Sequence, residues 1–271
     1  MTGKDALALR LHAKDFHTKH DITLHRGVRV TGVDRQARVV QNTEGTLPYT
    51  TLIMATGSLP FVPPVPSNTG TAGLVYRNLE DLDLIRAAAQ GARHGTVIGG
   101  GLLGLEAATA LRILGLHTSV IQLGGHLMSA QLDKEGGDAL KCRIEALGID
   151  VRTSHATKQI VPGQNCRHRL IFADDTTLET DMVVFSAGIR PQDQLGRDCG
   201  LEVAARGGIV IDQSCRTSDP AIFAIGECAS WQGQVFGLVA PGYAMARTVA
   251  TILAGEEAAF TGADMSIKLK L

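Results

Sequence analysis

Several features that mark particular protein classes are scarce in this sequence of 271 residues. Its five cysteines are odd in number and scattered, and no two of them form a CxxC pair. A zinc ribbon, an iron–sulfur ligand set and a dithiol redox centre normally need such pairs, so these sites are excluded and we predict no metal site. Scattered cysteines indicate reduced structural thiols and a reducing compartment, the cytoplasm.

Charge of one sign and long hydrophobic runs are also lacking. Lysine and arginine number 26 and acidic residues 27, so no broad basic surface for DNA or RNA is expected. The longest stretch without a formal charge, residues 113–132, contains His, Thr, Ser and Gln and is too polar to cross a bilayer. Charges within residues 1–17 exclude the apolar core of a signal peptide. We therefore expect neither a nucleic acid nor a membrane as partner.

The residues that are abundant favour an α/β fold. Hydrophobic residues make up 44% of the chain, and its 31 glycines supply many turns. Apolar and charged positions at helical spacing predict a surface helix over residues 5–19, and residues 22–55 contain short β-like runs that begin with ITLH. A link with four prolines between residues 60 and 66 favours a domain crossing.

Beyond this link, strand-like and helix-like segments alternate. The pattern predicts helices over residues 79–90, 102–114 and 132–147, and strands over 96–98, 119–123 and 149–152. This order indicates a parallel sheet with right-handed crossovers. Further segments are expected as follows: strands within 168–187, a short helix at 193–199, strands at 208–211 and 221–225, and a helix from Pro241 to residue 253.

The strongest chemical signal is a GxGxxG pattern in the sequence TVIGGGLLGLE at residues 96–106. The pattern alone is weak, but here it follows an apolar strand, opens an alanine-rich helix and leads to a second strand within about 30 residues. Gly99 would form the tight turn, Gly101 would admit a diphosphate to the backbone, and Gly104 would let the helix approach the strand. The alternative is a glycine turn that packs a helix and binds no ligand.

The start of the helix supplies the rest of the expected nucleotide site. N–H groups around Leu102 and Leu103, with the positive end of the helix, would bind the diphosphate of NAD(P)H. The acid expected at the end of the second strand is replaced by Gln122. Glutamine can bond the ribose but does not repel a 2′-phosphate, and no arginine follows closely to bind one, so we expect NADH to be preferred over NADPH.

Five motifs together resemble one known superfamily. They are LIMATGS at 52–58, GGGLLGLE at 99–106, FSAGIRP at 185–191, AIGECASW at 224–231 and VFGLVAPGY at 235–243. The chain resembles the pyridine nucleotide–disulfide oxidoreductase superfamily of two-dinucleotide flavoprotein reductases over nearly its whole length. Within it, the last two motifs are most similar to the flavin and NADH module of the assimilatory nitrite reductase large subunit.

The resemblance implies a Rossmann-like NAD(P)-binding domain inserted into an incomplete FAD-binding domain. The expected domains are residues 1–72 (first FAD-binding segment, without its GxGxxG unit), 73–187 (NAD(P)-binding) and 188–271 (second FAD-binding segment). Glu106 matches a family position near the nicotinamide. The remaining cofactor-binding positions that the resemblance implies are Ala55, Thr56, Gly57, Ala187, Gly188, Gly226, Glu227 and Pro241.

The implied activity is hydride transfer from NADH to FAD, followed by electron transfer to iron–sulfur and sirohaem centres elsewhere in a parent nitrite reductase. This chemistry needs no acid–base triad, and we predict no catalytic side chain. Nothing in residues 1–50 fits the glycine turn that holds FAD in the family, and the later cysteine clusters are missing. We therefore interpret the chain as a fragment truncated at both ends, expect FAD in the full-length protein, and leave FAD binding by this chain alone open.

Partners and alternatives follow from the same interpretation. The expected partners are NADH, the iron–sulfur and sirohaem domains of the parent chain, a small subunit, and a second copy in a homodimer formed through an unpaired sheet edge. The alternatives are a non-catalytic NAD(P)-binding fragment, or the flavoreductase of another electron-transfer chain such as a rubredoxin or ferredoxin reductase or an NADH oxidase. A methyltransferase-like sheet that binds a nucleoside is a third interpretation.

Overall fold

The computed structural model describes residues 6–67 and 73–269, which form two compact units. Unit 1 comprises Pro60–Ile189 and Ser266–Leu271, and unit 2 comprises Thr2–Leu59 and Arg190–Met265. Along the chain, unit 1 is thus inserted into unit 2. The sequence analysis placed these divisions at residues 72 and 187, of which residue 72 lies outside the described residues.

Unit 1 is built on a five-stranded parallel sheet with the strand order β6-β13-β7-β8-β9. Its strands are β6 (Leu74–Val75), β7 (His94–Ile98), β8 (His117–Ile121), β9 (Ile149–Arg152) and β13 (Met182–Phe185). Its helices are α2 (Leu79–Ala89), α3 (Leu102–Ile113) and α4 (Lys134–Ala146). These elements confirm the predicted parallel sheet and its three helices, and Asn78 closes a capping box at the start of α2.

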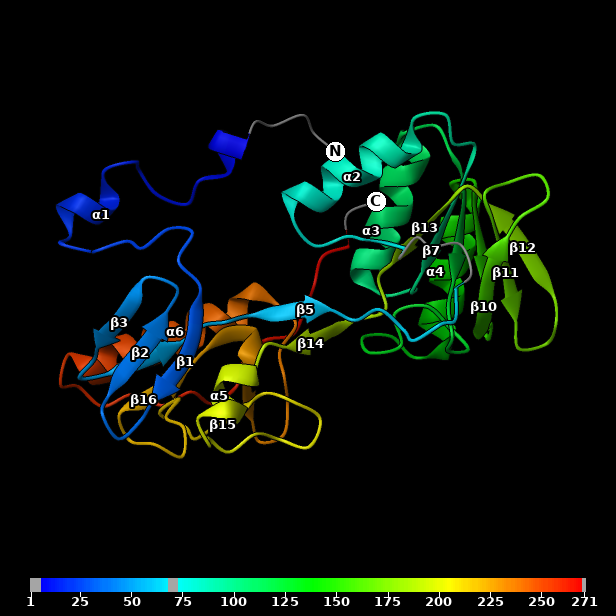
Figure 1. Cartoon of the computed structure of the whole chain (residues 1–271). Coiled ribbons are helices and arrows are strands. Elements are labelled where there is room, and N and C mark those ends of the chain that lie inside the picture. Colours follow the sequence, from blue (N-terminus) through cyan, green and yellow to red (C-terminus); the bar gives the residue numbers. More distant parts are fainter. Residues whose placement is uncertain (1–5, 68–72, 270–271) are drawn as a thin grey trace. The chain divides into compact units, whose positions relative to one another are not determined.

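Alternating residues of β13 show why the sheet is covered on both faces. Met182 and Val184 belong to a core with residues of α2, α3 and α4, whereas Val183 and Phe185 pack into a second core. The second core is shared with an antiparallel sheet of β10 (Thr157–Pro162), β11 (His168–Phe172) and β12 (Thr177–Thr180). A strand buried on both faces is apolar throughout, as the sequence MVVF is. Figure 1 shows the helices and this small sheet on opposite sides of the parallel sheet.

Unit 2 consists of small sheets around one apolar core. Its strands are β1 (Val30–Asp34), β2 (Val39–Asn42), β3 (Gly45–Pro48), β4 (Leu52–Met54), β15 (Ile209–Ile211), β16 (Ile222–Ala224) and β17 (Ala229–Trp231). β1, β2 and β3 form an antiparallel sheet, while β4 pairs with β16 and β15 with β17 in parallel. The core includes Phe223, Phe236, Met245 and Phe260.

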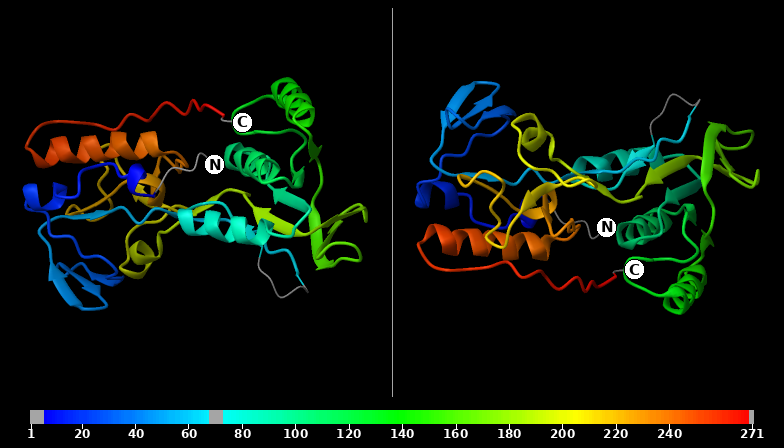
Figure 2. Two further views of the ribbon diagram at one scale, coloured as in Figure 1. Left: turned by 90° about the horizontal axis from the view of Figure 1, so that it is seen from above. Right: turned by 90° about the horizontal axis from the view of Figure 1, so that it is seen from below.

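Besides two short helical segments near its N-terminus, η1 (Ala6–Leu9) and α1 (Phe16–Lys19), unit 2 has the helix α5 (Gln194–Asp198), the 3₁₀ turn η2 (Gly226–Cys228) and the helix α6 (Val239–Leu253). Figure 2 shows α6 and the β1–β3 sheet on opposite sides of unit 2. Even α6, the longest helix in the described part of the chain, is too short to span a bilayer. The remaining strands, β5 (Ser58–Pro60) and β14 (Ile189–Pro191), pair with each other at the two places where the chain passes from one unit to the other.

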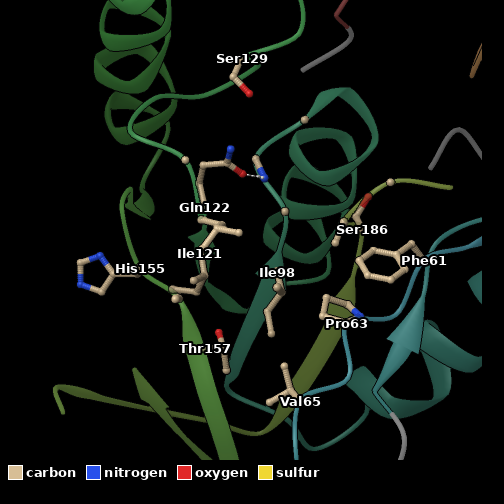
Figure 3. A pocket seen from close by; sticks show the side chains of 18 of the residues that line it. Phe61, Pro63, Val65, Ile98, Ile121, Gln122, Ser129, His155, Thr157 and Ser186 are labelled. Atoms are coloured by element: carbon tan, nitrogen blue, oxygen red, sulfur yellow. Dashed lines mark hydrogen bonds between the residues drawn. The ribbon is translucent and has the colours of Figure 1, made fainter. Parts of the chain in front are cut away.

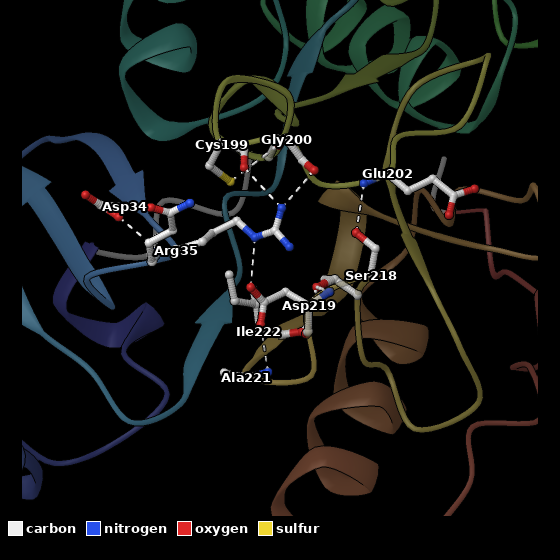
Figure 4. A network of polar contacts seen from close by, with 12 residues as sticks. Asp34, Arg35, Cys199, Gly200, Glu202, Ser218, Asp219, Ala221 and Ile222 are labelled. Atoms are coloured by element: carbon white, nitrogen blue, oxygen red, sulfur yellow. Dashed lines mark hydrogen bonds and ion pairs between the residues drawn. The ribbon is translucent and has the colours of Figure 1, made fainter.

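Arg35 connects three parts of unit 2 (Figure 4). It follows β1, and its Nε donates to Asp219 Oδ2 at 2.8 Å, next to the start of β16. Its Nη1 donates to the carbonyl oxygens of Cys199 at 3.3 Å and Gly200 at 2.9 Å, just after α5. The guanidinium therefore satisfies carbonyl groups at the end of α5 that the helix itself leaves unpaired.

Two predictions near the N-terminus were wrong. Residues 5–19 do not form one helix, because only the 3₁₀ turn η1 (Ala6–Leu9) and α1 (Phe16–Lys19) are helical in the described residues. The ITLH run at 22–25 is not a strand. Leu11 is 85% exposed and Leu24 52% exposed, so these apolar side chains have little to pack against. Short segments without tertiary packing do not hold regular structure in water.

Candidate functional site

The turn between β7 and α3 depends on close backbone approach. Gly99 has a φ of +125° and donates its N–H to the carbonyl oxygen of Ile121 at 2.8 Å. A Cβ atom on Gly99 would overlap the carbonyl oxygen of Ser186, and one on Gly104 would overlap the carbonyl oxygen of Gly99. Glycine is therefore required at both positions, and α3 lies directly against the end of the sheet.

Gly101, by contrast, has free space where a side chain would lie. A Cβ atom there would meet no atom within 4 Å. Gly101 is the N-cap of α3, and no side chain caps this helix. Because the first N–H groups of an α-helix have no partner within the helix, this end presents donors and partial positive charge to a ligand. A phosphate group is the ligand that such an end binds best.

The turn borders a cavity of about 860 Å³ in unit 1 (Figure 3). This volume lies in the range of small-molecule and cofactor sites, about 300–1,000 Å³. Of the positions predicted from the sequence, five line the cavity: Gly99, Gly101, Gln122, Ala187 and Gly188. Their sequence neighbours and three further segments, at residues 61–66, 128–131 and 155–158, complete the lining, so the cavity is formed by tertiary structure and not by the motif alone.

Gln122 follows β8, and its side chain turns toward the glycine turn (Figure 3). Its Oε1 accepts a hydrogen bond from the N–H of Gly100 at 2.8 Å. The oxygen is thus engaged within the protein, and the Nε2 amide group, a donor only, is the part of the side chain left for a ribose hydroxyl. A carboxylate at this position would present only acceptors.

Several lining residues were missed by the sequence analysis. Phe61, Pro63 and Val65 come from the proline-rich link, which we interpreted only as a crossing. His155 lies after β9, where its N–H donates to the carbonyl oxygen of Gln122 at 3.1 Å and its ring packs edge-on against Phe172. The proline cluster was the available signal, because a rigid apolar segment beside a glycine turn can form a pocket wall.

Four predicted positions of unit 1 lie away from the cavity lining: Leu102, Leu103, Gly104 and Glu106. Leu102 and Leu103 start α3, and the side chain of Leu103 is 38% exposed. Glu106 is half-buried one turn further along the helix. Burial, and after it the charge of Glu106, raise the pKa of the Tyr76 phenol, which places the carboxylate near Tyr76. Any contact of Leu102 and Leu103 with a diphosphate would therefore use their backbone N–H groups.

The Ala55, Thr56 and Gly57 turn of unit 2 is fixed by two hydrogen bonds to one residue. Thr56 Oγ1 donates to the carbonyl oxygen of Gln192 at 2.5 Å, and the N–H of Gln192 donates to the carbonyl oxygen of Gly57 at 2.9 Å. Gly57 has a φ of +71°, a conformation that glycine adopts without strain. β5 thus leaves unit 2 from this hydrogen-bonded turn, and β14 returns to unit 2 beside it.

Unit 2 also brings Gly226, Glu227 and the start of α6 together. Ser58 Oγ donates to Glu227 Oε2 at 2.8 Å. Gly226 has a φ of +73°, and its N–H donates to Met245 Sδ of α6 at 3.2 Å. Pro241 is the third residue of α6, because the helix begins two residues earlier than predicted. This cluster presents a carboxylate and an uncapped helix start.

Comparison with known proteins adds to this geometry. The chain is 53% identical over 270 residues to the NAD(P)H nitrite reductase large subunit of Klebsiella oxytoca, covering 99% of this chain and 28% of that protein. It is 51% identical over 265 residues to the NADH nitrite reductase large subunit of Escherichia coli, covering 97% and 31%. A crystal structure of a ferredoxin reductase from Rhodopseudomonas palustris superposes with a TM-score of 0.88 at 29% identity, covering 97% of this chain and 66% of that one. The chain thus spans about a third or less of these nitrite reductases.

Two-dinucleotide-binding flavoproteins are defined by two units. One unit carries a dinucleotide-type glycine turn and is inserted into a second unit that has its own glycine–acid turn. The chain belongs to the pyridine nucleotide-disulphide oxidoreductase family, whose sequence profile matches residues 4–251. These matches confirm the predicted fold class and the oxidoreductase class, and NAD(P)H and FAD are the cofactors of this family.

Proposed function

We propose that this chain is the NADH-binding reductase module of an assimilatory nitrite reductase. The observation that carries the proposal is the uncapped start of α3, which borders a cavity of cofactor size at a turn where glycine is required. The similarity to nitrite reductase large subunits over nearly the whole chain supports the choice of parent protein.

The residues of unit 1 fit a bound dinucleotide. Gly101 leaves room for a diphosphate at the helix start, where N–H groups can donate to its oxygens. Gln122 can donate its Nε2 amide to a ribose hydroxyl. Phe61, Pro63 and Val65 offer an apolar wall for a ring. When bound, NADH supplies a hydride and FAD accepts it and releases single electrons. The chain's own groups hold the nucleotide and exclude water from it.

For FAD the fit is partial. Glu227, held by Ser58, and the start of α6 can contact the flavin end of the cofactor. Residues 1–50 contain no GxGxxG turn for the adenine-side diphosphate. We therefore assign Ala55, Thr56, Gly57, Gly226, Glu227 and Pro241 to the flavin side, and Ala187 and Gly188 to the crossing that lines the nucleotide cavity.

NADH is the proposed electron donor in preference to NADPH. Among the residues that the structure describes, no arginine lines the cavity and one lysine does, Lys158, which is paired with Asp175 at 3.1 Å. A 2′-phosphate would therefore meet little free positive charge. In the full-length protein the proposed electron acceptors are iron–sulfur and sirohaem centres of further domains, the proposed partners are a small subunit and a second copy of the chain, and the proposed compartment is the cytoplasm.

A second candidate is the flavoreductase of another electron carrier. The TM-score of 0.88 to a ferredoxin reductase favours it, since that reductase has the same two-unit architecture. The acceptor that the reduced module serves separates the two candidates, because both would oxidise NADH.

The test is NADH oxidation by the purified chain supplied with FAD. With ferricyanide as acceptor, the proposal predicts FAD-dependent NADH oxidation that ADP-ribose inhibits by competing for the cavity. NADH binding without any FAD-dependent oxidation would leave only a nucleotide-binding module. Binding of S-adenosylmethionine in preference to NADH would contradict the proposal.

A further inference from the structure

Three side chains with different ligand atoms converge at the amino-terminal end of the unit 1 sheet. His94 starts β7, Cys166 lies in the β10–β11 turn, and Asp181 lies between β12 and β13. One ligand atom from each lies within 4.8 Å of the others. Cys166 Sγ is 3.6 Å and Asp181 Oδ2 is 3.7 Å from the same atom, Nδ1 of His94. The cluster joins residues up to 87 positions apart, so no spacing in the sequence indicated it.

This cluster is separate from the nucleotide cavity. None of the three residues lines that cavity. His94 is the first and Ile98 the last residue of β7, so the cluster and the glycine turn lie at opposite ends of the strand, about 13 Å apart at the usual rise of about 3.3 Å per residue. The inference therefore goes beyond the proposed function and does not depend on it.

The distances from His94 Nδ1 to Cys166 Sγ and to Asp181 Oδ2 are close to those between two ligands of one zinc ion. Bonds of about 2.3 Å to sulfur and about 2.0–2.1 Å to nitrogen or oxygen, at tetrahedral angles, place pairs of ligand atoms about 3.4–3.6 Å apart. Imidazole, thiolate and carboxylate are all common zinc ligands. We propose that His94, Cys166 and Asp181 bind a zinc ion, with the fourth position open to water.

A Cys–His–Asp catalytic arrangement would use the same residue types but a different geometry. In such a triad the nucleophile bonds one ring nitrogen of the histidine and the carboxylate bonds the other. Here Cys166 and Asp181 both face Nδ1 of His94, which is the convergence that a shared cation requires.

The three ligands are held in place by the surrounding backbone. Asp181 Oδ2 accepts from two backbone N–H groups, one of them that of His94 at 2.9 Å, and the N–H of Asp181 donates to the carbonyl oxygen of His94 at 2.9 Å. The carboxylate of Glu179 accepts from the N–H groups of Gln164 and Asn165, which fixes the turn that carries Cys166. Hydrogen bonds that orient the ligands in this way are typical of metal sites.

Zinc binding would tether the β10–β11 turn to the parallel sheet. The thiol proton of Cys166 passes to solvent as the Zn–S bond forms, and no redox change is involved. Because the site exists only in the folded unit, zinc would stabilise unit 1 against unfolding.

The test uses cobalt(II) as a spectroscopic probe in the chelator-treated, anaerobic full chain. We expect one cobalt per chain, with a sulfur-to-cobalt charge-transfer band and the visible bands of a tetrahedral ion, all displaced by zinc. Cys166→Ala removes the charge-transfer band and weakens binding by about 100-fold or more, beyond the loss caused by removing an outer hydrogen-bond partner. Cys142→Ala is the matched control, since Cys142 is exposed on α4, and it keeps the band.

Two further measurements keep the test decisive. His94→Ala, at a side chain that is 45% exposed and therefore tolerant of change, weakens cobalt binding while the Cys166 thiolate remains available. Zinc slows the modification of Cys166 by iodoacetamide and leaves that of Cys142 unchanged. The proposal is overturned if the unmodified chain shows no charge-transfer band, if Cys166→Ala retains it, or if zinc does not slow the alkylation of Cys166.

Discussion

The side-chain oxygen of Gln122 accepts a hydrogen bond of 2.8 Å from the backbone N–H of Gly100. This bond connects the end of β8 to the glycine turn and points the amide nitrogen away from it. A residue that would recognise the ribose thus also braces the turn that would hold the diphosphate. Nucleotide choice can therefore be tested at residue 122 with a substitution that keeps the oxygen that accepts from Gly100.

We predict that Gln122→Glu sharpens the preference for NADH. The new side chain has the same shape and can still accept from Gly100, but its negative charge repels a 2′-phosphate. The affinity for NADPH should fall about tenfold relative to that for NADH, a difference of about 1.4 kcal/mol. Titration of both nucleotides by fluorescence measures this ratio. Equal loss of both would show that residue 122 does not lie near the 2′ position.

Two glycine variants should separate nucleotide binding from folding. Gly101→Ala places a methyl group in open space at the helix start, so we expect a change of about 1 kcal/mol or less in the free energy of unfolding but a loss of about tenfold or more in NADH affinity. Gly104→Ala forces a methyl group against the carbonyl oxygen of Gly99, and should destabilise unit 1 by about 3 kcal/mol.

Urea denaturation and NADH titration of the two variants provide the comparison. If Gly101→Ala bound NADH as the unmodified chain does, the diphosphate would not lie at the start of α3. If Gly104→Ala were as stable as the unmodified chain, the close approach of α3 to the glycine turn would be wrong.

The cysteines should differ widely in reactivity. Burial, and then the charge of Asp212, raise the pKa of Cys215 to about 12, whereas Cys142 is exposed. At pH 8, brief alkylation followed by mass spectrometry should find Cys142 modified and Cys215 unmodified until urea unfolds the chain. Rapid modification of Cys215 in the native chain would contradict the packing of α6 on its surroundings.

The same pKa shift predicts a loss of stability at high pH. The unfolded Cys215 thiol ionises near its ordinary pKa of about 8.5, while the folded one stays protonated until about 12. Its contribution to stability is therefore complete below pH 8.5 and is lost as the pH rises toward 12. Cys215→Ala should show a smaller decline between pH 9 and 11 when urea unfolding is followed by circular dichroism.

Arg35→Met tests the network of Figure 4. The hydrogen bond from Arg35 lowers the pKa of the Asp219 carboxyl. The stability that this pair contributes is therefore present above the ordinary carboxyl pKa of about 3.9, and it is lost as the pH falls through the lower pKa of the folded state. We expect the variant to lose about 1–2 kcal/mol at pH 7 and less below pH 3. Trp231, the single tryptophan, lies in unit 2 and reports its unfolding by fluorescence. An equal loss at both pH values would contradict the role of Asp219.

The sequence predicted the centre of unit 1 well, because strong local signals agree there. An apolar strand, a glycine turn and an alanine-rich helix follow one another within residues 94–113, so the signals for all three lie in one short stretch of sequence. The prediction of one helix over residues 5–19 was wrong because the local pattern has no tertiary support. A helical pattern forms a helix only when its apolar face is covered, and Leu11 is exposed.

The site was predicted less completely than the fold. The glycine turn and Gln122 follow from a motif, but the walls supplied by Phe61 and His155 come from segments that only tertiary structure brings near it. The His94, Cys166 and Asp181 cluster likewise depends on three connections at one end of a sheet. Spacing rules find ligands carried on one element and cannot find those assembled from three.

The most direct test of the account is a nuclear magnetic resonance titration of the isotopically labelled chain with NADH, read at the backbone amides of Gly101, Leu102 and Leu103. We predict saturable shifts of these three amides that ADP-ribose reproduces and that Gly101→Ala weakens. NADH binding that does not change the chemical shifts of these amides would contradict the assignment of the diphosphate to the start of α3.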